Sequence, residues 1–224
     1  AVNTRSPAKR GNAAGNEGQL RLGFNVTLEN QGLWQDNTTV NTSINSNPGG
    51  GTFINSAADT YRKNGANTVS VSTGFTNNGA IDLLGGTLAL SGGGTLNGSF
   101  NVATGTTLQF GGGSFALNST ALSGNGRLLV SGGTVNQSGV LSLAAGASME
   151  LSGGTFNIAN ALSVATFTHS GGTLGGAGDL TVSGTASLGS AVGATTTMTG
   201  AGTTRFDGPL AIFGSGVHDF NAGR

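Results

Sequence analysis

The chain has 224 residues, of which 43 are glycine, only 3 are proline and none is cysteine. Nine basic and nine acidic residues give a formal net charge of zero, and 36% of the residues are hydrophobic. These values exclude a collagen-like repeat, a disulfide framework and thiolate metal sites, and they differ from the charged, weakly apolar composition of disordered chains.

Residues 1–18 show no hydrophobic periodicity, and we interpret them as an N-terminal arm or linker. Arg5, Lys9 and Arg10 form the one basic cluster, which we expect to be solvated. The lack of a wider basic surface argues against nucleic acid as a partner. No signal-peptide core follows Ala1, and no apolar run approaches the ~20 residues that span a bilayer. We therefore expect a segment of a longer protein, without a transmembrane segment.

From Gln19 onward apolar residues alternate with polar ones, at Leu20, Leu22, Phe24, Val26 and Leu28. A period of two predicts one strand with one buried face. If this strand lies at the open end of a stack of β-strands, its backbone is free to pair with a neighbouring molecule. We therefore also consider it a possible self-assembly strand.

The only tryptophan, Trp34, follows a break at residues 30–32. Its place beside a strand end favours packing at the open end of a core over a ligand platform. Residues 35–66 are rich in asparagine and threonine, and asparagine suits both left-handed corners and stacked hydrogen-bonded ladders. We predict cap-like first strands or coils over 19–50 and regular coils over 51–224, with a soft boundary near residue 50.

Short strands of three to five residues, bounded by Gly, Asn or Ser, are predicted along the rest of the chain. No segment has the apolar spacing of a helix, and its frequent glycines would destabilise one. The predicted strands lie at 52–55, 68–72, 74–79, 81–84, 87–90, 99–102, 107–110, 114–117, 127–130, 140–143, 148–151, 155–158, 179–182 and 204–206.

One phrase recurs among these strands: two or more glycines, then Thr or Ser, then a large apolar residue. Its last glycine falls at 94, 113, 133, 154 and 172, in steps of 19, 20, 21 and 18 residues. We predict that glycine makes a corner with positive φ and that Thr or Ser restarts the strand with its hydroxyl outward. The predicted corner residues are Gly86, Thr87, Gly94, Thr95, Gly113, Ser114, Gly133, Thr134, Gly154, Thr155, Gly172 and Thr173.

The step of about 20 residues decides between two all-β architectures. An antiparallel sandwich has no reason to repeat one phrase at a fixed period, whereas the coils of a solenoid place it at the same corner of every turn. We therefore predict a right-handed parallel β-helix of about 20 residues per coil, the hand following the rule for parallel crossovers.

The phrases between Gly85 and Gly139 (GGTLALSGGGTLNGSFNVATGTTLQF and SGNGRLLVSGGTVNQSG) resemble the β-solenoid repeats of large bacterial surface and secreted proteins. These are the filamentous-haemagglutinin-like and autotransporter-passenger proteins, and the resemblance covers roughly residues 50–206. It implies an extracellular parallel β-helix that serves as an adhesin, stalk or matrix fibre, and it supplies no catalytic residues.

Carbohydrate-active β-helices, polysaccharide-binding or lyase-like, are the alternative. Those that cleave polysaccharides require clustered acids for calcium, or a carboxylate pair, beside a basic residue. Stacking of coils could bring Asp59 to Asp82 or Asp179 to Arg205, but their steps of 23 and 26 residues miss the period. We expect no catalytic, cofactor or metal site.

Three weaker patterns favour structural interpretations. The two histidines, His169 and His218, are expected to be exposed solenoid residues rather than a metal pair or catalytic base. Residues 175–180 resemble half of a calcium-binding nonapeptide but have the aspartate displaced, which favours a glycine-rich corner. Residues 195–197 and 203–204 are threonine runs that do not repeat at the coil period as an ice-binding face would require.

The sequence thus predicts a non-catalytic structural or adhesive rod, extracellular or on a bacterial cell surface. The expected partners are further copies of the chain, joined end to end or by strand addition, or surface glycans of a host or matrix.

Overall fold

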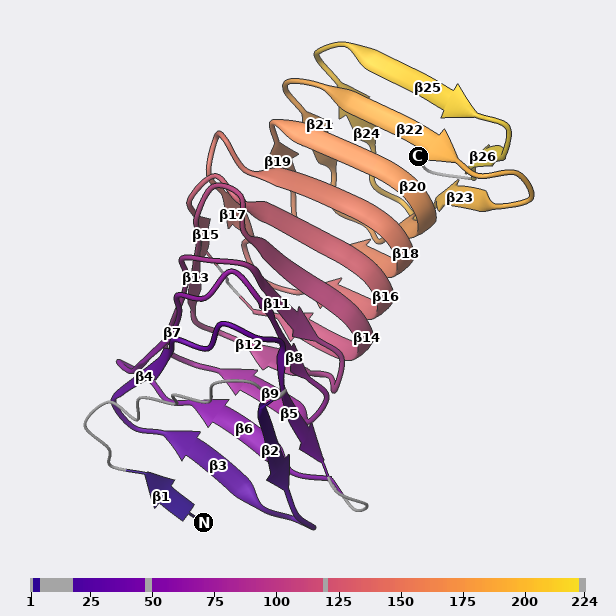
Figure 1. Ribbon diagram of the computed structural model, residues 1–224. Coiled ribbons are helices and arrows are strands. Elements are labelled where there is room, and N and C mark those ends of the chain that lie inside the picture. Colours follow the sequence, from indigo (N-terminus) through magenta and orange to yellow (C-terminus); the bar gives the residue numbers. More distant parts are fainter. Residues whose placement is uncertain (1, 5–17, 47–49, 119–120, 222–224) are drawn as a thin grey trace.

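The computed structural model of the chain describes residues 2–4, 18–46, 50–118 and 121–221. These residues form a β-solenoid of about nine turns spaced about 21 residues apart, and none of them is helical. Each strand pairs in parallel with the strand of the next coil, which confirms the parallel β-helix expected from the repeat. The coils stack in chain order, and the N- and C-terminal ends lie at opposite ends of the stack (Figure 1).

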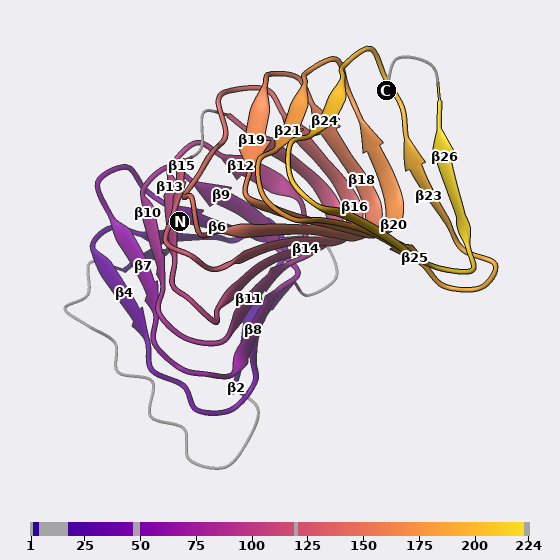
Figure 2. The ribbon, with the colours of Figure 1, turned by 90° about the horizontal axis from the view of Figure 1, so that it is seen from above.

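Each coil contributes strands to three faces, and the closed outline of single coils is visible at the N-terminal side of Figure 2. The first face holds β2 (Gly18–Leu22), β5 (Thr42–Ser46), β8 (Thr68–Val71), β11 (Thr87–Leu90), β22 (Ala186–Ser190) and β25 (Leu210–Gly214). The second face holds β1 (Val2–Thr4), β3 (Thr27–Asn30), β6 (Thr52–Asn55), β9 (Gly74–Asn77), β12 (Gly94–Leu96), β23 (Thr195–Met198) and β26 (Val217–Phe220).

Four long strands run through the corner between the first and second faces without interruption. They are β14 (Thr107–Leu117), β16 (Arg127–Gln137), β18 (Ser148–Ile158) and β20 (Thr166–Gly175). The third face holds β4 (Leu33–Asp36), β7 (Thr60–Lys63), β10 (Ala80–Leu83), β13 (Ser99–Val102), β15 (Ala121–Ser123), β17 (Ser142–Leu143), β19 (Leu162–Val164), β21 (Leu180–Val182) and β24 (Thr204–Phe206). The predicted strand at 140–143 is therefore shorter than expected.

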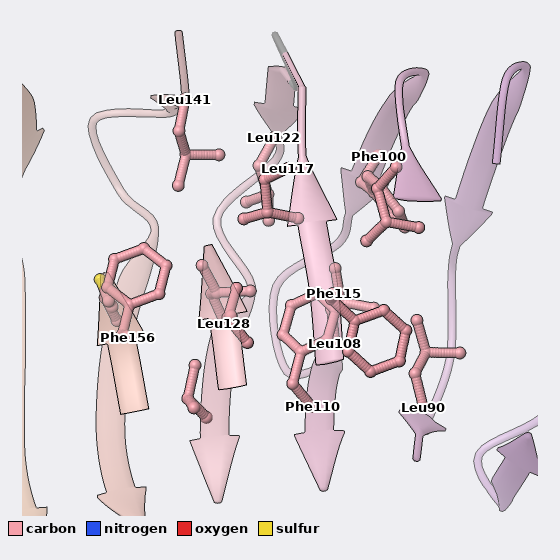
Figure 3. Close-up of a cluster of buried hydrophobic side chains, with 14 of the residues drawn as sticks. Leu90, Phe100, Leu108, Phe110, Phe115, Leu117, Leu122, Leu128, Leu141 and Phe156 are labelled. Carbon is pink, nitrogen blue, oxygen red and sulfur yellow. The ribbon is translucent and has the colours of Figure 1, made fainter. Parts of the chain in front are cut away.

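Alternation along each strand fills the interior of the solenoid. In β18 Met149, Leu151, Phe156 and Ile158 point inward and are buried, while the residues between them face outward. Figure 3 shows side chains from successive coils gathered inside the solenoid. Within one coil, Phe110 and Phe115 of β14 also meet there, with their ring centroids 4.9 Å apart. A coil cannot bury these residues alone, so its two neighbours supply the missing half of the core.

The Gly-Gly-Thr phrase forms the corner between the first and second faces. Gly113, Gly133, Gly154 and Gly172 all have φ between 67° and 80°. The Ser or Thr after each of them lies in the same continuous strand, with its side chain facing outward. The copy at residues 85–87 is an exception, because it lies between β10 and β11 and so turns from the third face to the first.

The single strand predicted from Leu20 to Leu28 is wrong. The chain forms β2 and β3 on two different faces, separated by a turn at Gly23–Val26 in which Asn25 has a φ of 54°. Phe24, at the tip of this turn, is 70% exposed. A run of period two can continue across a corner, so alternation alone does not reveal where a coil bends.

The described part of the first coils, residues 18–46, is in parallel register with the coils that follow, since β2, β3 and β4 pair with β5, β6 and β7. These coils are longer: Ile44 pairs with Val71, 27 positions later, whereas Leu128 pairs with Met149, 21 positions later. Within the expected arm, Val2–Thr4 forms β1 and pairs with β3. The basic cluster Arg5, Lys9 and Arg10 lies outside the described residues.

Candidate functional site

The outward surface of the second face carries stacked polar side chains, which we call the threonine ladder. It consists of Ser114, Thr134, Thr155, Thr173 and Thr197 in direct register. Parallel pairing spaces them by about 4.8 Å, one per coil. Four of these five residues belong to the repeated Gly-Gly-Thr phrase, and the fifth, Thr197, belongs to the threonine run at 195–197. The search of the sequence for Thr-x-Thr rows did not find this ladder, because each coil contributes only one of its residues.

A second polar row lies beside the threonine ladder. The amide of Asn97 donates to Asn78 Oδ1 at 2.7 Å, the amide of Asn118 donates to Asn97 Oδ1 at 3.1 Å, and the Ser138 hydroxyl donates to Asn118. We call it the outer asparagine ladder. Asn157 likewise donates to Asn136 at 2.8 Å. The stacked asparagine hydrogen bonds expected from the sequence are therefore present, and they fix amide groups at regular intervals along the surface.

Most acidic side chains among the described residues are held by a structural partner. Asp82 accepts from Arg62 at 2.8 Å across the third face, and Glu150 accepts from Arg127 at 2.8 Å across the first. Asp179 accepts from the Thr203 backbone at 2.7 Å. Hydrogen bonds from Ser56 and Gln31 lower the pKa of Glu29, and the neighbouring Arg205 lowers that of Asp207, chiefly through its hydrogen bond.

The acidic pairs considered from the sequence do not share a register position. Asp82 pairs with Arg62 and not with Asp59, and Arg205 pairs with Thr181 and not with Asp179. Residues 175–180 form the corner that leads into β21, where Gly176 has a φ of 99°. Among the described residues no three or more His, Asp or Glu side chains gather as metal ligands would.

The expectation that both histidines are exposed is wrong for His169. Its side chain is fully buried because it alternates with Phe167 on the inward side of β20, between Leu151 and Leu188 of the adjacent coils. Nε2 lies 3.1 Å from the Gly172 carbonyl oxygen, Nδ1 has no partner, and burial lowers the pKa to about 4. His218 is partly buried and contacts the Thr196 hydroxyl at 2.6 Å. Counting back one coil to Leu151 would have placed His169 correctly.

Trp34 packs against the core, in line with the preferred interpretation. It stacks on Tyr61 at a centroid distance of 6.4 Å and meets Phe53 edge-on at 5.5 Å. Phe53 in turn stacks on Phe75 at 5.5 Å and 6°. These aromatic contacts link the second and third faces of the first coils.

Sequence reasoning did not identify a buried polar cluster that lies at the corner between the third and first faces. Lys63 at the end of β7 is fully buried, and it lies in register with Asp36 of β4, whose carboxylate accepts from Thr38 and from the Tyr61 hydroxyl. Burial lowers the pKa of Lys63, and Asp36 opposes that change. Burial and Asp36 together raise the pKa of Tyr61. The inward positions of Tyr61 and Lys63, aligned with Ile81 and Leu83 one coil later, are the signal that could have identified this cluster.

Both ends of the described stack expose inward-facing apolar side chains. Ile212 of β25 is 64% exposed, although Leu188 at the same position one coil earlier is buried. Phe220 of β26 is likewise exposed above buried Met198. At the other end Leu20 of β2 is partly exposed over Ile44.

Within the described part of the chain, no helix has the length and apolar character needed to cross a membrane. No family model matches the chain, no curated protein matches it, and no solved structure matches it. The fold is thus established by the structure alone, and the likeness to haemagglutinin-like and autotransporter repeats is an expectation from the sequence.

Proposed function

We propose that the chain is a non-catalytic structural or adhesive β-solenoid, a rod-like segment of an extracellular bacterial surface protein. The observation that carries this proposal is the repetition of the outward surface. The threonine ladder and the outer asparagine ladder present the same hydroxyl and amide groups on coil after coil. A repeated row of weak hydrogen-bonding groups suits a repeated partner such as a surface glycan, because many small contacts add along the rod.

The use of the acidic residues supports the same proposal over a carbohydrate-cleaving β-helix. Asp82 and Glu150 are each paired with an arginine on an adjacent strand, and Asp179 ties two coils together through the Thr203 backbone. Each group therefore has a role in joining coils. A lyase or hydrolase needs such groups clustered around one substrate.

An array of cell-surface glycans probed with the labelled protein tests the proposal. We expect binding that the triple variant T134K/T155K/T173K weakens at least tenfold, because three adjacent positions of the threonine ladder then carry bulky, charged side chains. A matched change on the outward third face, S123K/T181K, should leave the binding unchanged. Release of new reducing or unsaturated ends from the bound glycans, lost in the variant E150Q, would replace this proposal with the carbohydrate-active alternative.

We further propose that rods associate end to end through a second copy of the chain. The exposed inward side chains Ile212 and Phe220 at one end and Leu20 at the other have the polarity of core residues. Strands at the end of a sheet can pair with the strand of another chain. Sedimentation of wild type and of I212D/F220D tests this proposal, with V192D on an exposed turn as the control. We expect concentration-dependent association that only the double variant loses; rods of one fixed length at all concentrations would contradict it.

A further inference from the structure

Lys63 is the one lysine or arginine that is fully buried among the described residues of the chain. Its Nζ donates to the carbonyl oxygen of Gly65, to that of Gly85 at 3.0 Å, and to Oδ1 of Asn67 at 3.3 Å. A large apolar residue also fits at this position, since Leu83 occupies it on the next coil. The amine therefore calls for a further explanation.

Asn67 is fixed from both ends of its carboxamide. Oδ1 faces the Lys63 amine, while Nδ2 donates to Thr38 Oγ1 at 3.0 Å and to the Val40 carbonyl oxygen at 2.5 Å. The amide carbon is thereby held next to a buried amine, with its nitrogen directed toward a hydroxyl. Such fixed proximity raises the rate of a reaction between two groups by many orders of magnitude.

Thr38 connects this amide nitrogen to an acid. Its hydroxyl donates to Asp36 Oδ1 at 2.6 Å, and Asp36 is in turn the register partner of Lys63 on the adjacent strand. Asp36 is itself buried and also accepts from the Tyr61 hydroxyl at 3.4 Å. A proton taken up by Asp36 can therefore reach Asn67 Nδ2 through a single hydroxyl group.

We propose that Lys63 and Asn67 form an intramolecular amide bond across this corner of the coil, with Asp36 and Thr38 moving the protons. The Nζ–Cγ bond forms and the Cγ–Nδ2 bond breaks. In the reaction Nζ leaves its carbonyl acceptors and passes two protons in all to Asp36, its register partner on the adjacent strand. One of these protons continues over Thr38 to the leaving Nδ2, and the other completes an ammonium ion. The reactants are one ammonium and one carboxamide, the products one secondary amide and one ammonium ion, and no oxidant or reductant is needed.

Burial and the charge of Asp36 act on the Lys63 amine in opposite directions. Burial lowers the pKa of Lys63, which increases the neutral fraction that can attack a carbonyl carbon. The carbonyl oxygen of Asn67 receives a hydrogen bond from the same nitrogen before the reaction and remains within the polar cluster afterwards.

Intact-mass spectrometry of the purified chain, followed by tryptic mapping, tests the proposal. We expect a mass lower than the sequence mass by one ammonia molecule and no tryptic cleavage after Lys63, so that the peptide beginning at Lys63 carries the loss. A full mass overturns the proposal. A loss of ammonia with cleavage after Lys63 intact also overturns it, because the succinimide that an Asn-Gly pair such as residues 64–65 can form has that signature.

Variants separate the chemistry from folding. K63R and N67A should each have the mass calculated from the variant sequence, without loss of ammonia. Circular dichroism should show that each variant still folds. For the positioning residues, T38S should retain the loss of ammonia and T38V should abolish it. D36N, which keeps the shape of the side chain but cannot carry the proton, should keep the full mass; an unchanged cross-link in folded D36N would refute the assigned relay.

Discussion

Gly154 has a φ of 69°, and a Cβ on this residue would lie 2.5 Å from the carbonyl oxygen of Gly133 on the preceding coil. Gly133 stands in the same relation to Gly113, at 2.3 Å. Two requirements coincide at this corner, a left-handed backbone and a close approach to backbone, and only glycine meets both. The glycine therefore recurs in the phrase because no other residue fits this corner of the coil.

Replacing Gly154 by alanine should lower the free energy of unfolding by more than the cost of placing an alanine in a left-handed backbone conformation. The backbone conformation costs about 1–2 kcal/mol, and the Gly133 carbonyl must also move. Gly105 provides the control, because its φ is 80° and no atom lies within 4 Å of its added Cβ. Urea unfolding followed by circular dichroism measures both. Equal losses in G154A and G105A would show that stacking at the corner contributes nothing.

His169 makes the stability of the fold depend on pH. Its pKa falls from the ordinary 6.5 to about 4 through burial, so the unfolded chain binds the proton more readily than the folded one. Stability should be complete above pH 6.5 and should decrease as the pH falls toward 4, by at most about 3 kcal/mol. The variant H169L should remove this part of the pH dependence and still fold, since Leu occupies the position on both adjacent coils. Parallel pH profiles for the two proteins would contradict the assignment.

At the scale of elements, asparagine also stacks inside the solenoid and links β3, β6 and β9. Asn30 donates to Asn55 Oδ1 at 2.7 Å, and Asn55 donates to Asn77 Oδ1 at 2.8 Å. Asn55 also donates to the Ala80 carbonyl oxygen at 2.9 Å on the third face. This inner asparagine ladder ties the second face to the third in the first coils.

The variant N55L should therefore destabilise the first coils, although Leu96 and Leu117 occupy the same column two and three coils later. It leaves the Asn30 amide and Asn77 Oδ1 each without one partner in the interior, and each such group costs about 1–3 kcal/mol. The matched change N97A on the exposed outer asparagine ladder should cost less than about 1 kcal/mol. Hydrogen exchange would place the loss of protection in β3, β6 and β9; a loss spread evenly over the rod would contradict this view.

The elements found from the sequence are those with a Gly-Gly-Thr phrase or a clean apolar alternation, such as both halves of β14, β16 and β18. Sequence reasoning missed β7, because its inward Lys63 is charged, and β22 and β25, because no corner phrase follows them. The buried polar cluster was beyond reach for the same reason: its members come from three segments whose register depends on long coils of 24 to 27 residues. Where the number of residues per coil varies, a fixed period cannot predict which residues of adjacent coils are in register.

At the scale of the whole molecule, each coil contacts mainly the coil before and the coil after it, so stability is a sum over neighbouring pairs. Removing residues 134–154 takes out one coil and joins Gly133 to Thr155, which restores the phrase Gly-Gly-Thr-Phe. We expect the shortened chain to fold with an unchanged circular dichroism spectrum per residue. Removing only residues 134–143 should prevent native packing, since inward and outward positions no longer stack; a folded product of this second deletion would argue against the coil as the unit.

The alignment of the backbone hydrogen bonds has a mechanical consequence. In a stack of parallel strands these bonds run along the rod, from each coil to the next (Figure 1). A load applied between the two ends therefore pulls them open in series, one coil at a time, rather than shearing a whole sheet at once. Each released coil lengthens the molecule by about 21 residues of extended chain. Such a rod would resist bending yet lengthen stepwise under tension and rewind when the load is removed, which would make it an extensible tether.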